Sequence, residues 1–339
     1  MIKMSRWSWL FAVLLLLLIM LLALASGSAS LSLIDIFTSL GHHLGEGQEW
    51  SDDRQGKDVI LWSIRFPRVM LAGLSGAGLS LVGATIQALV RNPMADPWLL
   101  GVSSGASLGA VLVIVSGLSL FGLASIHLMA FLGALAAASV IYFISRQGAH
   151  FSSTRLIFTG LAISFSLEAL TQILIFTANH QAQMQNVMFW TMGSLGGAEN
   201  KDLPLPAVSV MLGFILLFRC RNQLNVACLN EVKAFSLGLD FNALRRHLFL
   251  LCAALTSVIV SMTGSIGFVG LMVPHVLRLI LGNDYRLLIP GCLLGGAGFM
   301  IIADALARHL FSPHEIPIGV ITALLGSPIF IVLMRGSHD

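Results

Sequence analysis

The chain has 339 residues, of which 56% are hydrophobic and only 10% are Asp, Glu, Lys or Arg. An average soluble domain carries about 25% charged residues, so this chain cannot cover a globule of 36.3 kDa with a water-compatible surface. The composition excludes a soluble enzyme and a disordered protein. A formal net charge of +3 is also too small for a nucleic-acid binder. We therefore predict an all-α membrane protein, surrounded by lipid, with a single domain over residues 1–339.

Long apolar runs predict about ten transmembrane helices, because a helix needs about 20 mostly apolar residues to cross the hydrocarbon core. The span 270–282 is short, which leaves open whether it crosses the membrane completely. In chain order the candidate spans are 8–29, 66–90, 98–117, 119–145, 155–178, 204–219, 242–264, 270–282, 287–307 and 316–334.

The first candidate span is predicted to be a retained membrane anchor. Lys3 and Arg6 precede it, and the small residues of 23–29 resemble a signal-peptide cleavage site. Its apolar run from Trp9 to Ala25 is longer than the roughly 7–15 residues of a signal-peptide core. The length of this run therefore favours an uncleaved helix.

The distribution of charge predicts that the N- and C-termini are cytoplasmic. With the N-terminus inside, the inside connections are 91–97, 146–154, 220–241 and 283–286. Together with their flanks they carry Arg91, Arg146, Arg155, Arg219, Arg221, Lys233, Arg245, Arg246 and Arg286. The first outside loop, 42–60, carries five acidic residues against Arg54 and Lys57. Cations inside and an acidic loop outside agree with the positive-inside rule.

Small residues recur every four positions in two of the candidate spans. Small side chains allow helices in lipid to approach closely, so these stripes predict helix–helix contacts. The stripes comprise Ala72, Gly76, Ser80 and Ala84 in one span and Gly101, Gly105 and Gly109 in the next.

Motifs for nucleotide or metal binding are missing from the sequence. No GxxxxGK(S/T) segment occurs, so the chain has no P-loop of its own. The four cysteines lack CxxC spacing and the ten histidines lack metal-ligand spacing. We expect no metal site and no cofactor bound by this chain.

Polar residues inside the candidate spans are candidates for function, because they are costly at membrane depth. Ser164, Glu168 and Gln172 are spaced by four residues and predict a polar stripe on one helix. A translocation path and a buried hydrogen-bonding role both explain such a stripe. Asp304 lies four residues before Arg308, which predicts an intrahelical ion pair with a structural role.

Several dense motifs occur in order between about residue 60 and residue 335. The motifs are Arg65-Phe-Pro-Arg68 and the segments 76–87, 91–97, 100–106, 189–195, 267–278 and 315–330. Together they closely resemble the FecCD family of ABC importer permeases, and their number and order make the resemblance specific.

This resemblance implies a type II ABC importer permease fold in the bacterial inner membrane. It implies a homodimer or a paralogous heterodimer of ten-span subunits, with the translocation path along their interface. Two cytoplasmic ATPase subunits, which hold ATP and Mg, would bind below, and a periplasmic substrate-binding protein would dock above. The chain itself would be a transport subunit and not an enzyme. The family carries ferric siderophores, haem and vitamin B12; we expect a ferric siderophore, with haem and vitamin B12 as alternatives.

The resemblance also implies where the partners bind. Arg65, Arg68 and Arg308 stand against the positive-inside bias, and similar proteins use such arginines to grip acidic residues of the binding protein. The alternatives are interfacial anchoring or pairing with the acidic first loop. The inside connection 220–241 matches the family's coupling segment, although an ordinary solvated loop is also consistent with it. Its expected contacts with the ATPase are Glu231, Ala234, Leu237 and Gly238.

The connection 146–154 corresponds to the cytoplasmic exit in similar permeases. Ser152, Ser153 and Thr154 are therefore candidates for a gate, with helix capping as the alternative. An ion-coupled secondary transporter, with Glu168 and Asp304 as proton carriers, is a competing function of a different class. An intramembrane enzyme is a third class, for which the sequence offers no catalytic constellation.

Overall fold

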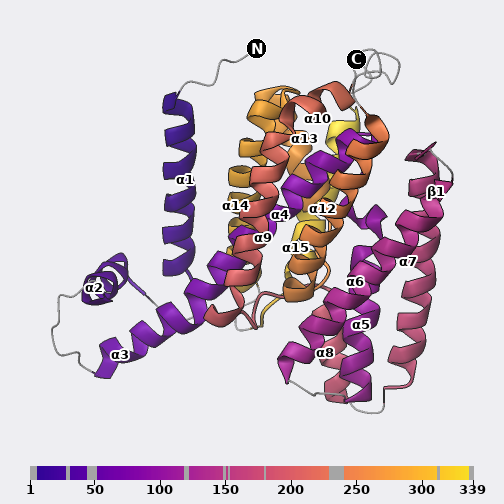
Figure 1. Ribbon diagram of the computed structural model, residues 1–339. Coiled ribbons are helices and arrows are strands. Elements are labelled where there is room, and N and C mark those ends of the chain that lie inside the picture. The colour runs from indigo at the N-terminus through magenta and orange to yellow at the C-terminus, as the bar shows by residue number, and fades with distance from the viewer. Residues whose placement is uncertain are drawn as a thin grey trace.

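The computed structural model describes residues 6–27, 31–43, 52–117, 122–147, 150–151, 153–178, 181–228, 240–310 and 314–335. Over these residues the chain is almost entirely helical (Figure 1). Two strands of two residues each, β1 (Arg146–Gln147) and β2 (His150–Phe151), form a short antiparallel pair. The prediction of an all-α fold is confirmed.

The long helices coincide with the predicted spans. They are α1 (Arg6–Ala25), α4 (Phe66–Val90), α5 (Val102–Ser116), α6 (Leu123–Ser145), α7 (Ser153–Phe176), α9 (Pro204–Arg219), α12 (Phe241–Thr263), α13 (Val269–Leu281), α14 (Tyr285–His309) and α15 (Ile318–Arg335). Among the described residues, seven helices are long and apolar enough to cross a membrane. The apolar helices α5, α13 and α15 are shorter.

Short elements between the spans were not predicted. They are α2 (Leu33–His43), α3 (Asp52–Val59), the π-helix η1 (Ile60–Arg65), the 3-10 helices η2 (Pro97–Leu100) and η3 (Asn200–Asp202), α8 (Gln181–Thr191) and α10 (Arg221–Ala227). The prediction that residues 42–60 form a loop is wrong for the second half of that range. There α3 and η1 continue into α4 as one helix from Arg54 to Val90. Most residues of α3 are polar, so a search for apolar runs does not detect this helix.

Helix α4 is the centre of one group of helices, in which α9, α12, α13 and α14 pack around it (Figure 1). Its residues from Ser75 to Val90 are buried on every side. A Cβ atom added at Gly76 would lie 2.1 Å from the carbonyl oxygen of Gly296 in α14. One added at Gly83 would lie 1.7 Å from the carbonyl oxygen of Gly270 in α13. Glycine therefore permits backbone-to-backbone packing on two faces of this helix.

Helices α5, α6, α7 and α8 form a second group beside the first, and α12 connects the two by packing against α5 and α6 (Figure 1). Here a Cβ atom at Gly105 of α5 would lie 2.3 Å from the carbonyl oxygen of Gly133 in α6. At Gly109 it would lie 2.1 Å from that of Met129. The predicted role of the small-residue stripes in helix packing is confirmed in both groups.

Candidate functional site

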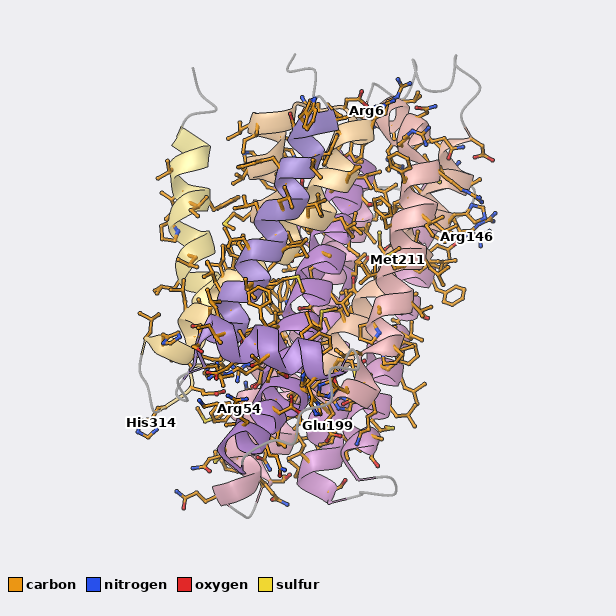
Figure 2. The ribbon with its side chains drawn as sticks, turned by 90° about the vertical axis from the view of Figure 1, so that its left-hand side faces the viewer. Arg6, Arg54, Arg146, Glu199, Met211 and His314 are labelled. Atoms are coloured by element: carbon orange, nitrogen blue, oxygen red, sulfur yellow. The ribbon has the colours of Figure 1, made fainter. Side chains whose placement is uncertain are left out.

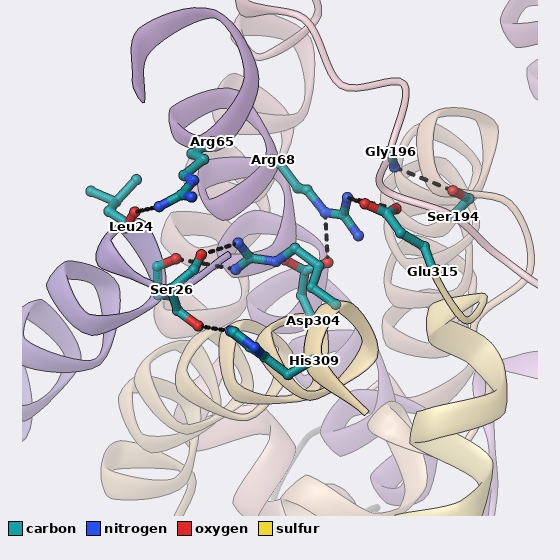
Figure 3. A network of polar contacts seen from close by, with 11 residues as sticks. Leu24, Ser26, Arg65, Arg68, Ser194, Gly196, Asp304, His309 and Glu315 are labelled. Atoms are coloured by element: carbon teal, nitrogen blue, oxygen red, sulfur yellow. Dashed lines mark hydrogen bonds and ion pairs between the residues drawn. The ribbon is translucent and has the colours of Figure 1, made fainter. Parts of the chain in front are cut away.

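A cluster of charged residues lies where α1 ends, α4 begins and α14 ends, and it contains the three arginines singled out in the sequence (Figure 3). Pro67 lies directly after the π-helix η1, inside the continuous helix from Arg54 to Val90, and offers no backbone N–H to that helix. The helical start places Arg65 and Arg68 one turn apart, facing the last turn of α14. We call Arg65, Arg68, Asp304, Arg308 and Glu315 the arginine network.

Arg68 connects two acidic residues that are distant in sequence. Its Nε donates to Asp304 Oδ1 at 2.9 Å, and its Nη1 donates to both carboxylate oxygens of Glu315 at 2.9 and 2.8 Å. The side chain of Asp304 is 1% exposed, whereas that of Glu315 is 49% exposed. One guanidinium therefore holds a fixed, buried acid and a second acid that reaches solvent.

Arg308 completes the buried part of this cluster. Its Nε lies 3.0 Å from Asp304 Oδ2, an ion pair without the alignment of a hydrogen bond. The predicted pair between positions 304 and 308 is thus confirmed. The Nη1 and Nη2 atoms of Arg308 donate to the carbonyl oxygens of Ser26 and Ala23, at 2.8 and 3.2 Å.

Arg65 binds the same end of α1. Its Nη1 donates to the carbonyl oxygens of Leu24 and Ala25 at 2.7 and 2.9 Å. The last carbonyls of a helix have no partners within it and carry partial negative charge, so guanidinium groups stabilise them well. Two arginines thereby fix the end of α1 to α4 and α14, and Ser26 is also hydrogen-bonded to His309 (Figure 3).

A second polar cluster, which sequence reasoning missed, lies near the opposite end of α4. Gln87 donates to the carbonyl oxygen of Leu271 at 3.2 Å and accepts a hydrogen bond from Arg278. Tyr285 accepts from Arg278 at 3.2 Å and donates to the carbonyl oxygen of Ala84 at 2.9 Å. One feature of the sequence could have indicated this cluster, because Gln87 and Arg278 are the last residues of two of the motif segments. Helix α4 therefore carries an anchored polar group at each end.

A partly open cavity of about 380 Å³ lies between η2 and the segment from Ser265 to Leu271 that leads into α13, with α4, α5 and α12 contributing one residue each. Its mostly apolar wall includes Asp96, which precedes η2 and accepts a hydrogen bond from the backbone N–H of Trp98 at 2.8 Å. Burial raises the pKa of Asp96 to about 6, and the hydrogen bond from Trp98 opposes this shift. Ser103 and Thr256 line the same cavity.

The model of the FecCD transport family matches residues 15–336. The chain belongs to the FecCD transport family. The cobalamin import system permease protein BtuC of Halobacterium salinarum is 39% identical over 277 residues, which are 82% of this chain and 73% of that protein. The hemin transport system permease protein HmuU of Yersinia pestis is 39% identical over 294 residues, 86% of this chain and 87% of that protein.

A solved structure agrees with the sequence relatives. It is described as an inward-facing conformation of a metal-chelate type ABC transporter, and it matches with a TM-score of 0.85 and 30% identity. The match covers 98% of this chain and 100% of that one. This member of the FecCD family is therefore a multi-pass permease subunit of a type II ABC importer. Its relatives are named for cobalamin, hemin or metal chelates.

In this FecCD permease the three arginines predicted to dock the binding protein are buried or nearly so. Arg65 and Arg68 are 5% and 8% exposed, and Arg308 points its donors into the chain. Sequence reasoning placed these side chains at the surface, because it could not see their partners in α1 and α14. Docking on them stays a prediction, and Glu315 is the most exposed charge of the arginine network.

The predicted stripe on α7 is not uniform in its surroundings. Ser164 is buried beside Gly101, whereas Glu168 and Gln172 are exposed. Four residues advance an α-helix by one turn plus about 40°, so the side chains drift around the axis. Ser164 therefore differs from Glu168 and Gln172 in burial. The translocation-path role of all three residues stays a prediction.

The remaining predicted site residues are only partly described. Glu231, Ala234, Leu237 and Gly238 of the coupling segment lie outside the described residues, as does Ser152. Ser153 begins α7 and Thr154 is exposed in its first turn, so the gate stays a prediction. Within the described part of the chain, no three His, Cys, Asp or Glu side chains gather as metal ligands.

Proposed function

We propose that this chain is the permease subunit through which an ATP-driven importer moves a bulky iron complex, specifically a ferric siderophore, across the bacterial inner membrane. The observation that carries the proposal is the full-length likeness to a metal-chelate type transporter. The hemin permease at 39% identity supports an iron-containing substrate as well. The cobalamin permease at the same identity favours vitamin B12 as the alternative substrate.

The arrangement of charges supports a ten-span topology with cytoplasmic termini. Figure 2 places Arg6 and Arg146 toward one end of the molecule and Arg54, Glu199 and His314 toward the other. Helix α1 begins and α15 ends at the end where Arg6 lies (Figures 1 and 2). This distribution agrees with the positive-inside rule if that end is cytoplasmic.

The proposed assembly contains two permease subunits, two ATPase subunits that bind ATP and Mg, and a periplasmic binding protein. The binding protein docks at the arginine network, and the ATPase contacts the segment 220–241. Alternating access would follow from docking on one side and ATPase closure on the other. Asp304 is held in ion pairs by Arg68 and Arg308, which supports a structural role over the proton-carrier role of an ion-coupled transporter.

Uptake by the reconstituted complex tests this function. The complex is assembled in liposomes with its ATPase and binding protein and is given ferric siderophores, hemin and vitamin B12 in turn. We expect ATP-dependent uptake of a ferric siderophore. If only hemin or only vitamin B12 is taken up, that compound replaces the ferric siderophore as the proposed substrate. Uptake without ATPase that collapses with the proton gradient would replace the ABC mechanism with ion coupling.

A further inference from the structure

We propose that Glu315 occupies, in the undocked permease, the place that a carboxylate of the binding protein takes on Arg68. Docking would exchange the internal carboxylate for the external one and release the segment that leads into α15. This inference rests on the proposed function and adds a regulatory step to it. The permease would then sense docking by losing one of its own ion pairs.

The geometry of Arg68 suits such an exchange. A guanidinium presents its N–H donors in a rigid, planar arrangement, so that different donors can bind different carboxylates at the same time. The Nε edge is fixed on the buried Asp304, so Arg68 stays in place when its other partner leaves. The Nη1 donor is bound by both oxygens of Glu315, which is half-exposed. An incoming carboxylate reaches this donor from solvent without disturbing the buried pair.

The charge of the arginine network favours an acidic partner. Arg65, Arg68 and Arg308 supply three positive charges, and Asp304 and Glu315 supply two negative ones. The network therefore carries a surplus of one positive charge, and it includes Glu315, the neighbour of His314, which lies toward the same end of the bundle as Arg54 (Figure 2). Such a surplus attracts and orients an acidic surface. The exchange keeps this charge unchanged, because one carboxylate replaces another on Arg68 while Glu315 moves into water.

The position of Glu315 links this exchange to α15. Glu315 lies three residues before the start of α15, and a Cβ atom added at Gly196 would lie 3.6 Å from its Oε2. Beyond it, the backbone N–H groups of Ile318 and Gly319 donate to the carbonyl oxygens of Gly193 and Met192, each at 3.0 Å. Loss of the Glu315 contact would leave α15 attached to the end of α8 but would free the segment before it from α4.

Competition between the two carboxylates gives a direct test. Glu315→Gln in the complete permease–ATPase complex, held in lipid nanodiscs, removes the internal competitor and leaves Arg68 in place. We expect the binding protein to bind about fivefold more tightly than to wild type. The matched control is Glu199→Gln, because Glu199 has the same 49% side-chain exposure and pairs with Lys201 at 2.6 Å. Unchanged or weaker binding by the Glu315 variant would overturn the exchange.

A second measurement does not depend on removing Glu315. A spin label on His314→Cys, in a background where Cys220 and Cys228 are serine, reports the mobility of the segment before α15. We expect mobility to increase when the binding protein is added, and an unchanged spectrum would overturn the proposal.

Failure of docking itself gives a different pattern. Arg68→Gln with unchanged binding-protein affinity would remove the docking assignment. Weakened binding by Arg68→Gln, combined with wild-type binding by Glu315→Gln, would leave docking intact and remove only the exchange.

Discussion

Arg308 donates a hydrogen bond to the carbonyl oxygen of Ser26 at 2.8 Å, across 282 positions of sequence. This bond joins the end of α14 to the end of α1, a helix that otherwise lies at the side of the bundle with most of its surface exposed (Figure 1). Because Arg308 also pairs with Asp304, one side chain anchors the first helix and neutralises a buried acid.

Replacing Arg308 by methionine should destabilise the permease by about 3 kcal/mol, because it leaves Asp304 with one of its two cations and removes the guanidinium donors to the carbonyl oxygens of Ala23 and Ser26. Thermal unfolding of the purified chain in detergent measures the effect. Arg54→Met is the control, since Arg54 is exposed and its loss should change the melting temperature little. Equal melting temperatures for both variants would contradict the anchoring role.

Gly83→Ala should disrupt the contact between α4 and α13. The added Cβ would lie 1.7 Å from the carbonyl oxygen of Gly270, and backbone on both sides cannot yield as a flexible side chain would. We expect a loss of about 3 kcal/mol and a lower yield of monodisperse protein, measured by gel filtration and thermal unfolding. Gly56→Ala is the control, because nothing lies within 4 Å of its added Cβ. A fully stable Gly83 variant would show that this packing is loose.

Asp96→Asn should make the melting temperature of the permease less dependent on pH above the unfolded pKa of Asp96. The pKa of Asp96 rises from 3.8 to about 6 on folding, so between these values the folded state binds more protons than the unfolded state. This group's stabilising contribution is present below pH 3.8 and is lost as pH rises through about 6. The variant keeps an acceptor for Trp98 and should match wild type near about pH 4 but exceed it near about pH 7.5.

Asp284→Asn should behave in the opposite way and serves as the comparison. Asp284 caps α14 by accepting from the backbone N–H of Arg286 at 2.9 Å, and this bond lowers its pKa. Its stabilising contribution is present above the unfolded pKa and is lost as pH falls. Asn at this position should therefore lower stability near neutral pH. If Asp96→Asn lowers the melting temperature near about pH 7.5, as Asp284→Asn should, the assignment for Asp96 is wrong.

Glu168→Ala should reduce substrate uptake severalfold without changing the melting temperature, because Glu168 is exposed on α7 and contributes little to packing. ATP-dependent uptake in liposomes, together with thermal unfolding, measures both effects. Ser166→Ala is the control on the same helix, since the Ser166 hydroxyl donates to the carbonyl oxygen of Ala162 in its own helix at 2.9 Å. Wild-type uptake by the Glu168 variant would remove it from the translocation path.

The sequence by itself determined the properties that depend on neighbouring residues. An apolar run of about 20 residues forms a helix in lipid wherever it lies in the chain, so every predicted span coincides with a helix. The pair of Asp304 and Arg308 is set by one helical turn. Small residues spaced by four positions likewise predicted a close helix–helix contact, although the spacing did not predict which helix would be the partner.

Only the tertiary structure decided the partners. Arg68 meets Asp304 and Glu315 across 236 and 247 positions, and Arg65 meets the end of α1 across about 40. Their motif positions suggested surface arginines, yet the fold buries them against acids and carbonyls that no local pattern reveals. The physical reason is that a guanidinium is satisfied by any acceptor of suitable geometry, and which acceptor it meets depends on how the helices pack.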